Sequence, residues 1–133
     1  MTFEDWEQAL AAERFGLRLS SGVSESALTG AGEALGSPLP GSLADFYRFT
    51  DGIFDEPGQW YVAWPLARLV GENQARPLPG LVGFGDDGTG DWFAVRGRDG
   101  IVVYVSRVTG DQHHLADSLA TFWSGWLAGE ITT

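Results

Sequence analysis

The sequence predicts an α+β fold in which N-terminal helices and a C-terminal helix flank an antiparallel or mixed β-sheet meander. Three observations support this prediction. Apolar residues recur at helical spacing before residue 51, alternate at period two between residues 60 and 115, and return to helical spacing near the C-terminus. Short turns join the predicted strands, so consecutive strands can pair antiparallel without long crossovers. Helices and strands that segregate in this way are typical of α+β domains.

Capping residues and helical spacing predict three helices in the N-terminal part of the chain. They cover residues 2–14, 24–36 and 42–50. The first and third helices begin with a capping-box pattern, Thr2-x-x-Asp5 and Ser42-x-x-Asp45. Ser24 is expected to cap the second helix, and Gly36 is expected to end it.

Strand patterns follow the third predicted helix. They cover residues 60–64, 81–84, 91–96, 101–105 and 112–115. Pro65 is expected to open a short helix or turn after the first of these strands. Asp-Gly at residues 99–100 is a hairpin signal, because this pair tolerates the positive φ of a tight turn. Leu119, Phe122 and Trp126 at helical spacing predict the final helix.

Length and composition predict a single domain over residues 1–133. Of the 133 residues, 44% are hydrophobic and 20% are charged, which is a globular composition. The 18 acidic and 8 basic side chains give a formal net charge of −10. We expect no nucleic-acid partner, because binding to phosphates requires a cationic surface.

Missing residue types exclude several kinds of chemistry. The sequence contains neither Cys nor Lys, which excludes disulfides, thiolate metal sites and Schiff-base catalysis. Residues 1–6 are acidic and amphipathic, unlike a secretory signal, and no apolar run reaches the roughly 20 residues of a membrane span. We therefore expect a cytoplasmic protein with no membrane segment.

Three motifs that resemble chemical sites have simpler structural interpretations. The glycines of residues 83–88 match a dinucleotide fingerprint, but a predicted strand follows them where that motif needs a helix N-terminus. The aspartates of residues 86–91 could bind a hard cation, yet their spacing differs from an EF-hand, and Asp also builds turns. His113 and His114 face opposite sides of an extended segment, which is typical of a solvated pair at a sheet edge.

Acidic clusters and exposed tryptophan are the candidate binding features. The predicted interface residues are Asp51, Asp55, Glu56, Trp60, Asp86, Asp87 and Asp91. If the two acidic loops lie at one rim, they form a negative patch that speeds encounter with a basic partner; the alternative is a generic acidic surface that favours solubility. Trp60, Trp64 and Trp92 either form a partly exposed patch that anchors a protein or lie under a helix.

Several segments resemble, in order, the signature of the SUKH superfamily. The matching segments are residues 33–40, 43–52, 84–94, 115–122 and 126–127. The first two are similar to the pattern "lG-x-pLP, l-x-x-fY, nG", and the third is similar to "FG-D-G-x-D-x-f". The ordered set extends over about residues 24–128.

The resemblance implies an α+β fold with helices around a mixed or antiparallel sheet. It also implies that the motif residues are mainly architectural and that the protein needs neither catalysis nor a cofactor. Bacterial members are largely immunity proteins that bind and block a cognate toxin, and the family is named for a fungal regulator of cell-wall synthesis. The expected partner is a cognate toxin domain of a polymorphic toxin system, basic in view of the −10 charge and of the nuclease type.

Two other functions stay open at this point. A general interaction or scaffold domain in cell-wall or signalling regulation would bind several partners at modest affinity. A hydrolase that uses Asp or His would need a nucleophile, a base and an orienting group, and the sequence shows no such set. The leading hypothesis is therefore a binding protein that is not an enzyme.

Overall fold

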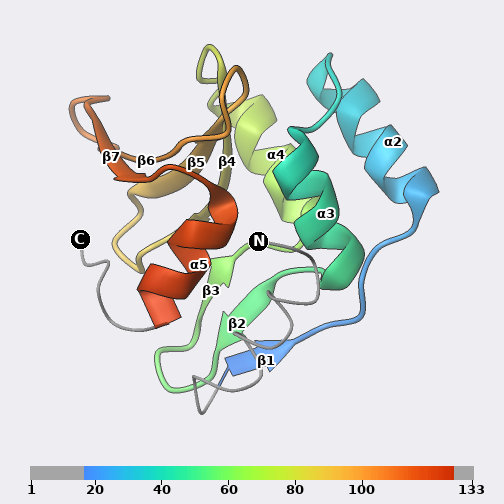
Figure 1. The fold of residues 1–133 in the computed structure, drawn as a ribbon, viewed down its shortest axis with the longest axis horizontal. Helices are drawn as coiled ribbons and strands as arrows, with labels where there is room; N and C mark the ends of the chain where they lie inside the picture. The colour runs from blue at the N-terminus through green and yellow to red at the C-terminus, as the bar shows by residue number, and fades with distance from the viewer. Residues whose placement is uncertain (1–16, 128–133) are drawn as a thin grey trace.

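The computed structural model of the chain describes residues 17–127 (Figure 1). In chain order the elements are β1 (Leu17–Leu19), α2 (Glu25–Leu35), α3 (Gly41–Phe49), β2 (Ile53–Asp55), β3 (Trp60–Ala63), α4 (Leu66–Ala75), β4 (Leu81–Asp86), β5 (Trp92–Arg96), β6 (Val102–Val105), β7 (Gln112–Ala116) and α5 (Leu119–Leu127). These elements confirm the predicted α+β class. The predicted helix over residues 2–14 lies outside the described residues.

The described strands form two antiparallel sheets, ordered β1-β2-β3 and β4-β5-β6-β7. The sequence predicts strands only from residue 60 onward, so it misses β1 and β2. Each of these has three residues, and they pair across a long separation, with Leu17 opposite Asp55. A strand this short carries too little alternation to be recognised without its partner.

The two sheets adjoin where β3 ends beside β4. The backbone N–H of Trp64 donates to the carbonyl oxygen of Phe84 at 2.7 Å. A Cβ on Gly85 would overlap the carbonyl oxygen of Val62, so the two strands pass each other more closely than a side chain permits. Close packing of β4 on β3 therefore accounts for this glycine of the residue 83–88 motif.

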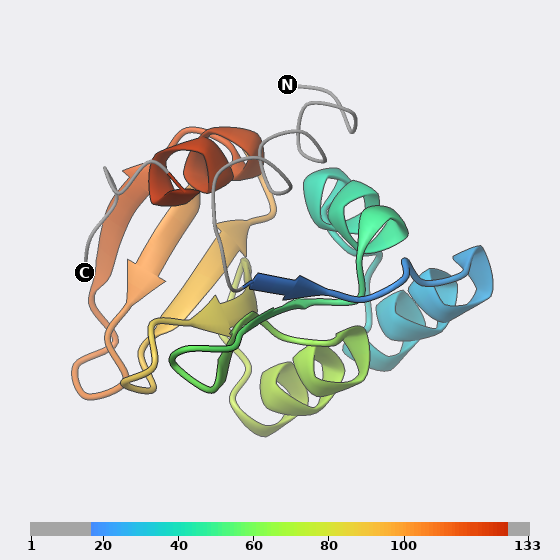
Figure 2. The same cartoon turned by 90° about the horizontal axis from the view of Figure 1, so that it is seen from below.

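Helices cover the strands from two sides (Figure 2). α3 and α5 lie on one side, α4 lies on the other, and α2 is at the edge beyond α3 and α4. The core between the layers is aromatic: Phe46 of α3 stacks on Trp123 of α5 with ring centroids 5.5 Å apart, and Phe84 of β4 lies 6.1 Å from Trp123. All three side chains are fully buried.

The helix termini confirm one predicted cap and correct another. Ser24 caps α2 by accepting a hydrogen bond from the N–H three residues on, at 3.1 Å, and Gly36 ends the helix with a left-handed φ of 85°. The predicted capping box at Ser42 is wrong, because α3 already begins after Pro40. Ser42 Oγ is buried with no hydrogen-bond partner among the described residues, and Asp45 instead accepts from Arg48 at 2.7 Å.

α4 is a helix of 10 residues where the sequence predicts a short helix or turn. Its first N–H, on Leu66, donates to Asp51 Oδ1 at 2.7 Å, so an aspartate that precedes β2 caps α4. Asn73 fixes α4 to β4, because its side-chain amide accepts from Gly83 N at 2.9 Å and donates to Gly83 O at 2.8 Å. Between residues 17 and 127, no helix combines the length and the apolar character needed to cross a membrane.

Candidate functional site

Six of the seven predicted interface residues lie in two loops that meet at one rim of the molecule. The loops are residues 55–60, around the β2–β3 turn, and residues 86–91, between β4 and β5; together we call them the loop rim. Trp60 joins them, because its Nε1–H donates to the carbonyl oxygen of Asp86 at 3.2 Å and its ring lies against Gly88. The seventh residue, Asp51, lies apart at the N-terminus of α4.

Two of the predicted interface residues are buried, which corrects the expectation that all of them are exposed. Asp55 is 4% exposed and accepts a hydrogen bond from Gly58 N at 3.2 Å. Asp86 is 9% exposed, and it accepts from Trp64 Nε1 at 2.9 Å and from Gly88 N at 2.7 Å. Asp86 thus provides the acceptor for the buried indole N–H of Trp64, and both carboxylates hold a loop N–H, so they support the rim from beneath.

The outer carboxylates of the β4–β5 loop also hold structure together. Tyr104 Oη lies 2.9 Å from Asp87 Oδ2 and 2.8 Å from Asp91 Oδ2, and Asp91 Oδ1 accepts from the backbone N–H of Arg107 at 2.8 Å. The Arg107 N–H, followed by the Tyr104 hydroxyl, lowers the pKa of Asp91. Burial and the hydrogen bonds to both carboxylates raise the pKa of Tyr104. Asp87 Oδ1 also accepts from Thr89 N, two residues on, at 2.9 Å, which confirms the predicted turn-building role for Asp87.

The tryptophans do not form one exposed patch. Trp64 and Trp92 are buried and meet edge to face, with ring centroids 5.1 Å apart. Arg68 of α4 lies 5.3 Å from the Trp64 ring, and Arg76, which follows α4, lies 5.2 Å from the Trp92 ring. Of the three tryptophans, Trp60 alone is half-buried and reaches the surface.

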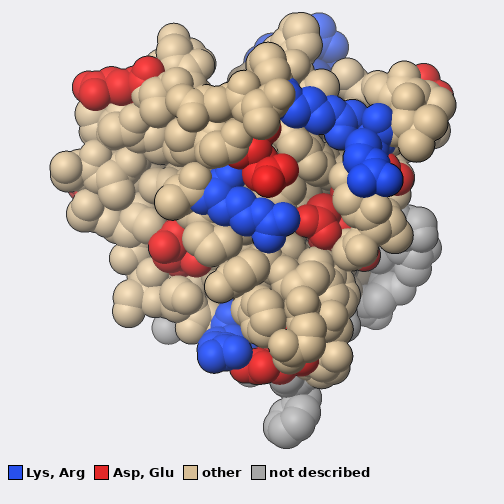
Figure 3. All heavy atoms as spheres, turned by 180° about the vertical axis from the view of Figure 1, so that it is seen from behind, with Lys and Arg blue, Asp and Glu red and all other residues tan. Residues whose placement is uncertain are grey.

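Arginines interleave with the acidic residues of the loop rim. Arg18 forms an ion pair with Glu56, and Arg68 Nη2 lies 3.8 Å from Asp86 Oδ2. On the face seen from behind, blue and red side chains accordingly lie next to one another (Figure 3). The loop rim is therefore not the continuous negative patch that two adjacent acidic loops predict.

The two histidines lie exposed on β7, the edge strand of the four-stranded sheet, as predicted for a solvated pair. His114 Nε2 is 2.8 Å from Asp117 Oδ1. Within the described part of the chain, no three His, Asp or Glu side chains gather closely enough to hold a metal ion.

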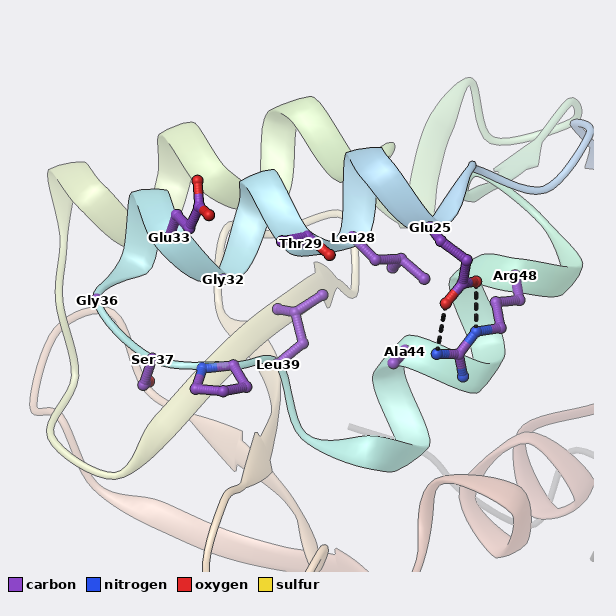
Figure 4. Close-up of a pocket in the computed structure, with 11 residues that line it drawn as sticks. Glu25, Leu28, Thr29, Gly32, Glu33, Gly36, Ser37, Leu39, Ala44 and Arg48 are labelled. Carbon is purple, nitrogen blue, oxygen red and sulfur yellow. Dashed lines mark hydrogen bonds and ion pairs between the residues drawn. The ribbon is translucent and has the colours of Figure 1, made fainter.

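A second surface feature is a groove of about 640 Å³ between α2 and residues 36–48, which we call the helix groove (Figure 4). Leu28 of α2 and Leu39 of the connection face each other across it. Glu25 and Arg48 close one end, with two hydrogen bonds of 2.8 and 3.0 Å between them. Sequence patterns did not predict this groove, because it depends on the angle at which two helices meet.

The charges around the helix groove are unevenly paired. Arg48 binds both Glu25 and Asp45, and its hydrogen bond lowers the pKa of Glu25, which therefore stays ionised. Glu33, near the other end of α2, is exposed, and its carboxylate makes no hydrogen bond or ion pair with any described residue. Three carboxylates and one guanidinium thus lie around the groove, which leaves its surroundings negative.

The sequence model of the SMI1 / KNR4 family (SUKH-1) matches residues 22–125. The chain belongs to this family. The match includes both the loop rim and the helix groove, and it confirms the resemblance seen in the motifs. Domains of this superfamily are generally non-catalytic immunity or regulatory domains. No curated protein matches the sequence.

The motif residues of this SUKH-1 domain hold its layers together. Tyr47 of the α3 motif is fully buried, and its hydroxyl donates to the carbonyl oxygen of Trp64 at 2.6 Å. Phe84, Gly85 and Asp86 of the central motif provide a core ring, a close strand approach and a buried hydrogen-bond acceptor, as described above. The SUKH-1 motif therefore describes architecture, and a binding surface has to be sought outside these buried groups.

Proposed function

We propose that this SUKH-1 domain is an immunity protein that binds and neutralises a cognate bacterial polymorphic toxin. The family match over residues 22–125 carries the proposal, because SUKH domains commonly serve in toxin immunity. The net charge of −10 supports a basic toxin of the nuclease type, because opposite charges steer association. In this proposal the chain is one domain that acts in the cytoplasm by occupying the toxin and catalyses no reaction.

The outer surface of the loop rim is the proposed point of first contact. Glu56, Trp60, Asp87 and Asp91 are all partly exposed there. An aromatic ring beside carboxylates suits a cationic protein surface, since the ring contributes apolar area and the carboxylates contribute attraction. Asp55 and Asp86 contribute indirectly, by holding the two loops in place.

Co-expression with the toxin genes that neighbour this gene tests the proposed function. We expect one neighbour to arrest growth alone and to be neutralised when this protein is present. A pull-down from native lysate should then recover that toxin as one stoichiometric partner. Several weak partners and no rescue would favour the general interaction or scaffold function instead, and the absence of both would contradict immunity.

The contribution of the loop rim can be measured by stopped-flow association with the purified toxin. Glu56→Gln removes one negative charge from the rim, and Asp117→Asn removes one from an exposed position after β7. We expect Glu56→Gln to slow association more than Asp117→Asn at low salt and the difference to vanish at high salt, because screening weakens steering. Equal rates for the two variants at low salt would place the contact elsewhere.

A further inference from the structure

The helix groove is formed before any partner binds. An added Cβ on Gly32 of α2 would lie 3.1 Å from the Cα of Pro38, so the helix and the following connection are in near backbone contact. Gly36 N donates to Glu33 O at 3.2 Å and Ser37 N donates to Gly32 O at 3.0 Å, which fixes the turn that closes the groove. Because the groove is already formed, the protein loses little conformational entropy on binding. Most of the favourable contact energy therefore contributes to affinity.

The lining of the groove selects one kind of occupant. Its walls are apolar at Leu28 and Leu39, and its volume of about 640 Å³ lies in the usual range for binding pockets. The carboxylate of Glu33 has no partner among residues 17–127, and Glu25 shares the guanidinium of Arg48 with Asp45. An apolar side chain can therefore enter the groove, and a cation that flanks this side chain outside the groove can pair with the exposed carboxylate of Glu33, which points away from Leu39 (Figure 4).

We infer that the helix groove binds a short segment of the partner protein in which apolar side chains are flanked by lysine or arginine. The inference rests on the proposed function for the identity of the partner, the toxin. It adds a second contact surface to the loop rim and states the chemistry that this surface recognises. The chain's own residues 1–16 fit poorly, because they carry Glu4, Asp5, Glu7 and Glu13 against one arginine.

A pair of synthetic peptides tests this chemistry on the full-length protein. One peptide combines leucine and lysine at helical spacing, and the other has the same pattern with glutamate in place of lysine. Two-dimensional NMR of ¹⁵N-labelled protein should show shifts in α2 and residues 37–48 with the lysine peptide and none with the glutamate peptide. Equal shifts with both peptides, shifts with neither, or self-association through these residues as the protein concentration rises would overturn the inference.

Two variants and one control make the test specific. Thr29→Arg places a bulky cation at an exposed position in the groove, and Glu33→Lys reverses the unpaired charge. Each variant should lower the affinity for the lysine peptide by about tenfold or more, or about 1.4 kcal/mol, because Thr29→Arg blocks the groove with a like charge and Glu33→Lys turns an attraction into a repulsion. Asp117→Lys makes the same charge change as Glu33→Lys, but in the connection between β7 and α5, which does not line the groove, and should leave affinity unchanged.

Measurements with the toxin distinguish failure of the groove inference from failure of the proposed immunity function. If Thr29→Arg and Glu33→Lys capture the toxin as tightly as the parent protein, the groove inference fails and immunity stands. If the lysine peptide binds in the groove while no neighbouring toxin is neutralised by the parent protein, immunity fails and the groove chemistry stands.

Discussion

The loop rim and the helix groove both carry carboxylates, but they use them differently. In the loop rim, Asp86 accepts hydrogen bonds from the buried Trp64 Nε1 and from Gly88 N. At the helix groove, the carboxylate of Glu33 has no hydrogen-bond or ion-pair partner among the described residues. A carboxylate that already satisfies a buried donor cannot turn to a partner without leaving that donor unsatisfied. Acidic composition therefore does not locate a binding surface; the availability of each carboxylate does.

The largest expected effect comes from adding one methyl group to the strand that leads into the loop rim. Gly85→Ala forces a Cβ into the carbonyl oxygen of Val62, so β4 must move away from β3. We expect a loss of about 3 kcal/mol or more in the free energy of unfolding, measured by urea denaturation. Gly30→Ala on the groove helix is the matched control, because nothing lies within 4 Å of its added Cβ. It should leave stability unchanged or raise it by up to about 1 kcal/mol.

Removing one carboxylate from the loop rim and one from the helix groove compares what each contributes to stability. Asp86→Ala leaves Trp64 Nε1 and Gly88 N without their acceptor, which should cost about 2–3 kcal/mol of unfolding free energy. Glu33→Ala removes an exposed side chain that has no described partner and should change stability by less than about 0.5 kcal/mol. Similar losses for the two variants would remove the distinction between the regions.

A smaller effect is expected from the hydroxyl that bridges the two outer aspartates of the rim. Tyr104→Phe removes the contacts to Asp87 and Asp91 and should cost about 1 kcal/mol of unfolding free energy, measured by urea denaturation.

The same variant tests the pH dependence of the rim. The folded pKa of Asp91 lies below its ordinary value of 3.8, so its contribution to stability is present above that value and is lost as the pH falls through the folded pKa. In the Tyr104→Phe protein, an NMR titration of the Asp91 carboxyl should show a partial rise in its pKa. A full return to the ordinary value would mean that the Arg107 N–H contributes nothing.

The smallest expected effect is a difference in salt response between the two regions. The pKa of Glu25 is lowered by an exposed ion pair with Arg48, whereas that of Asp91 is lowered chiefly by a backbone N–H. At about 1 M salt the screening length falls to about 3 Å, so the pKa of Glu25 should rise toward its ordinary value. Asp91 should respond less, because its hydrogen bonds are fixed by the fold. A larger salt shift at Asp91 than at Glu25 would contradict this assignment.

The sequence alone determined the local structure of this protein and its family. Ser24 and Gly36 mark the ends of α2 because capping depends on residues within one turn of the helix end. The Asp-Gly pair at residues 99–100 marks the β5–β6 hairpin for the same reason, since a tight turn depends on its own backbone angles. The ordered motifs were sufficient to identify a SUKH domain, because they preserve the residues that build its turns and core.

Tertiary structure alone decided which strands pair, which acids are buried and where a groove remains. β1 exists because its three residues meet β2 across two intervening helices. From the sequence, Asp86 is expected to be an exposed loop residue. In the structure it is buried and accepts a hydrogen bond from the indole N–H of Trp64, which is distant in sequence. The helix groove depends on how α2 and α3 are held at Gly32 and Pro38. Each outcome is a contact between residues far apart in the chain, and neither spacing nor composition carries that information.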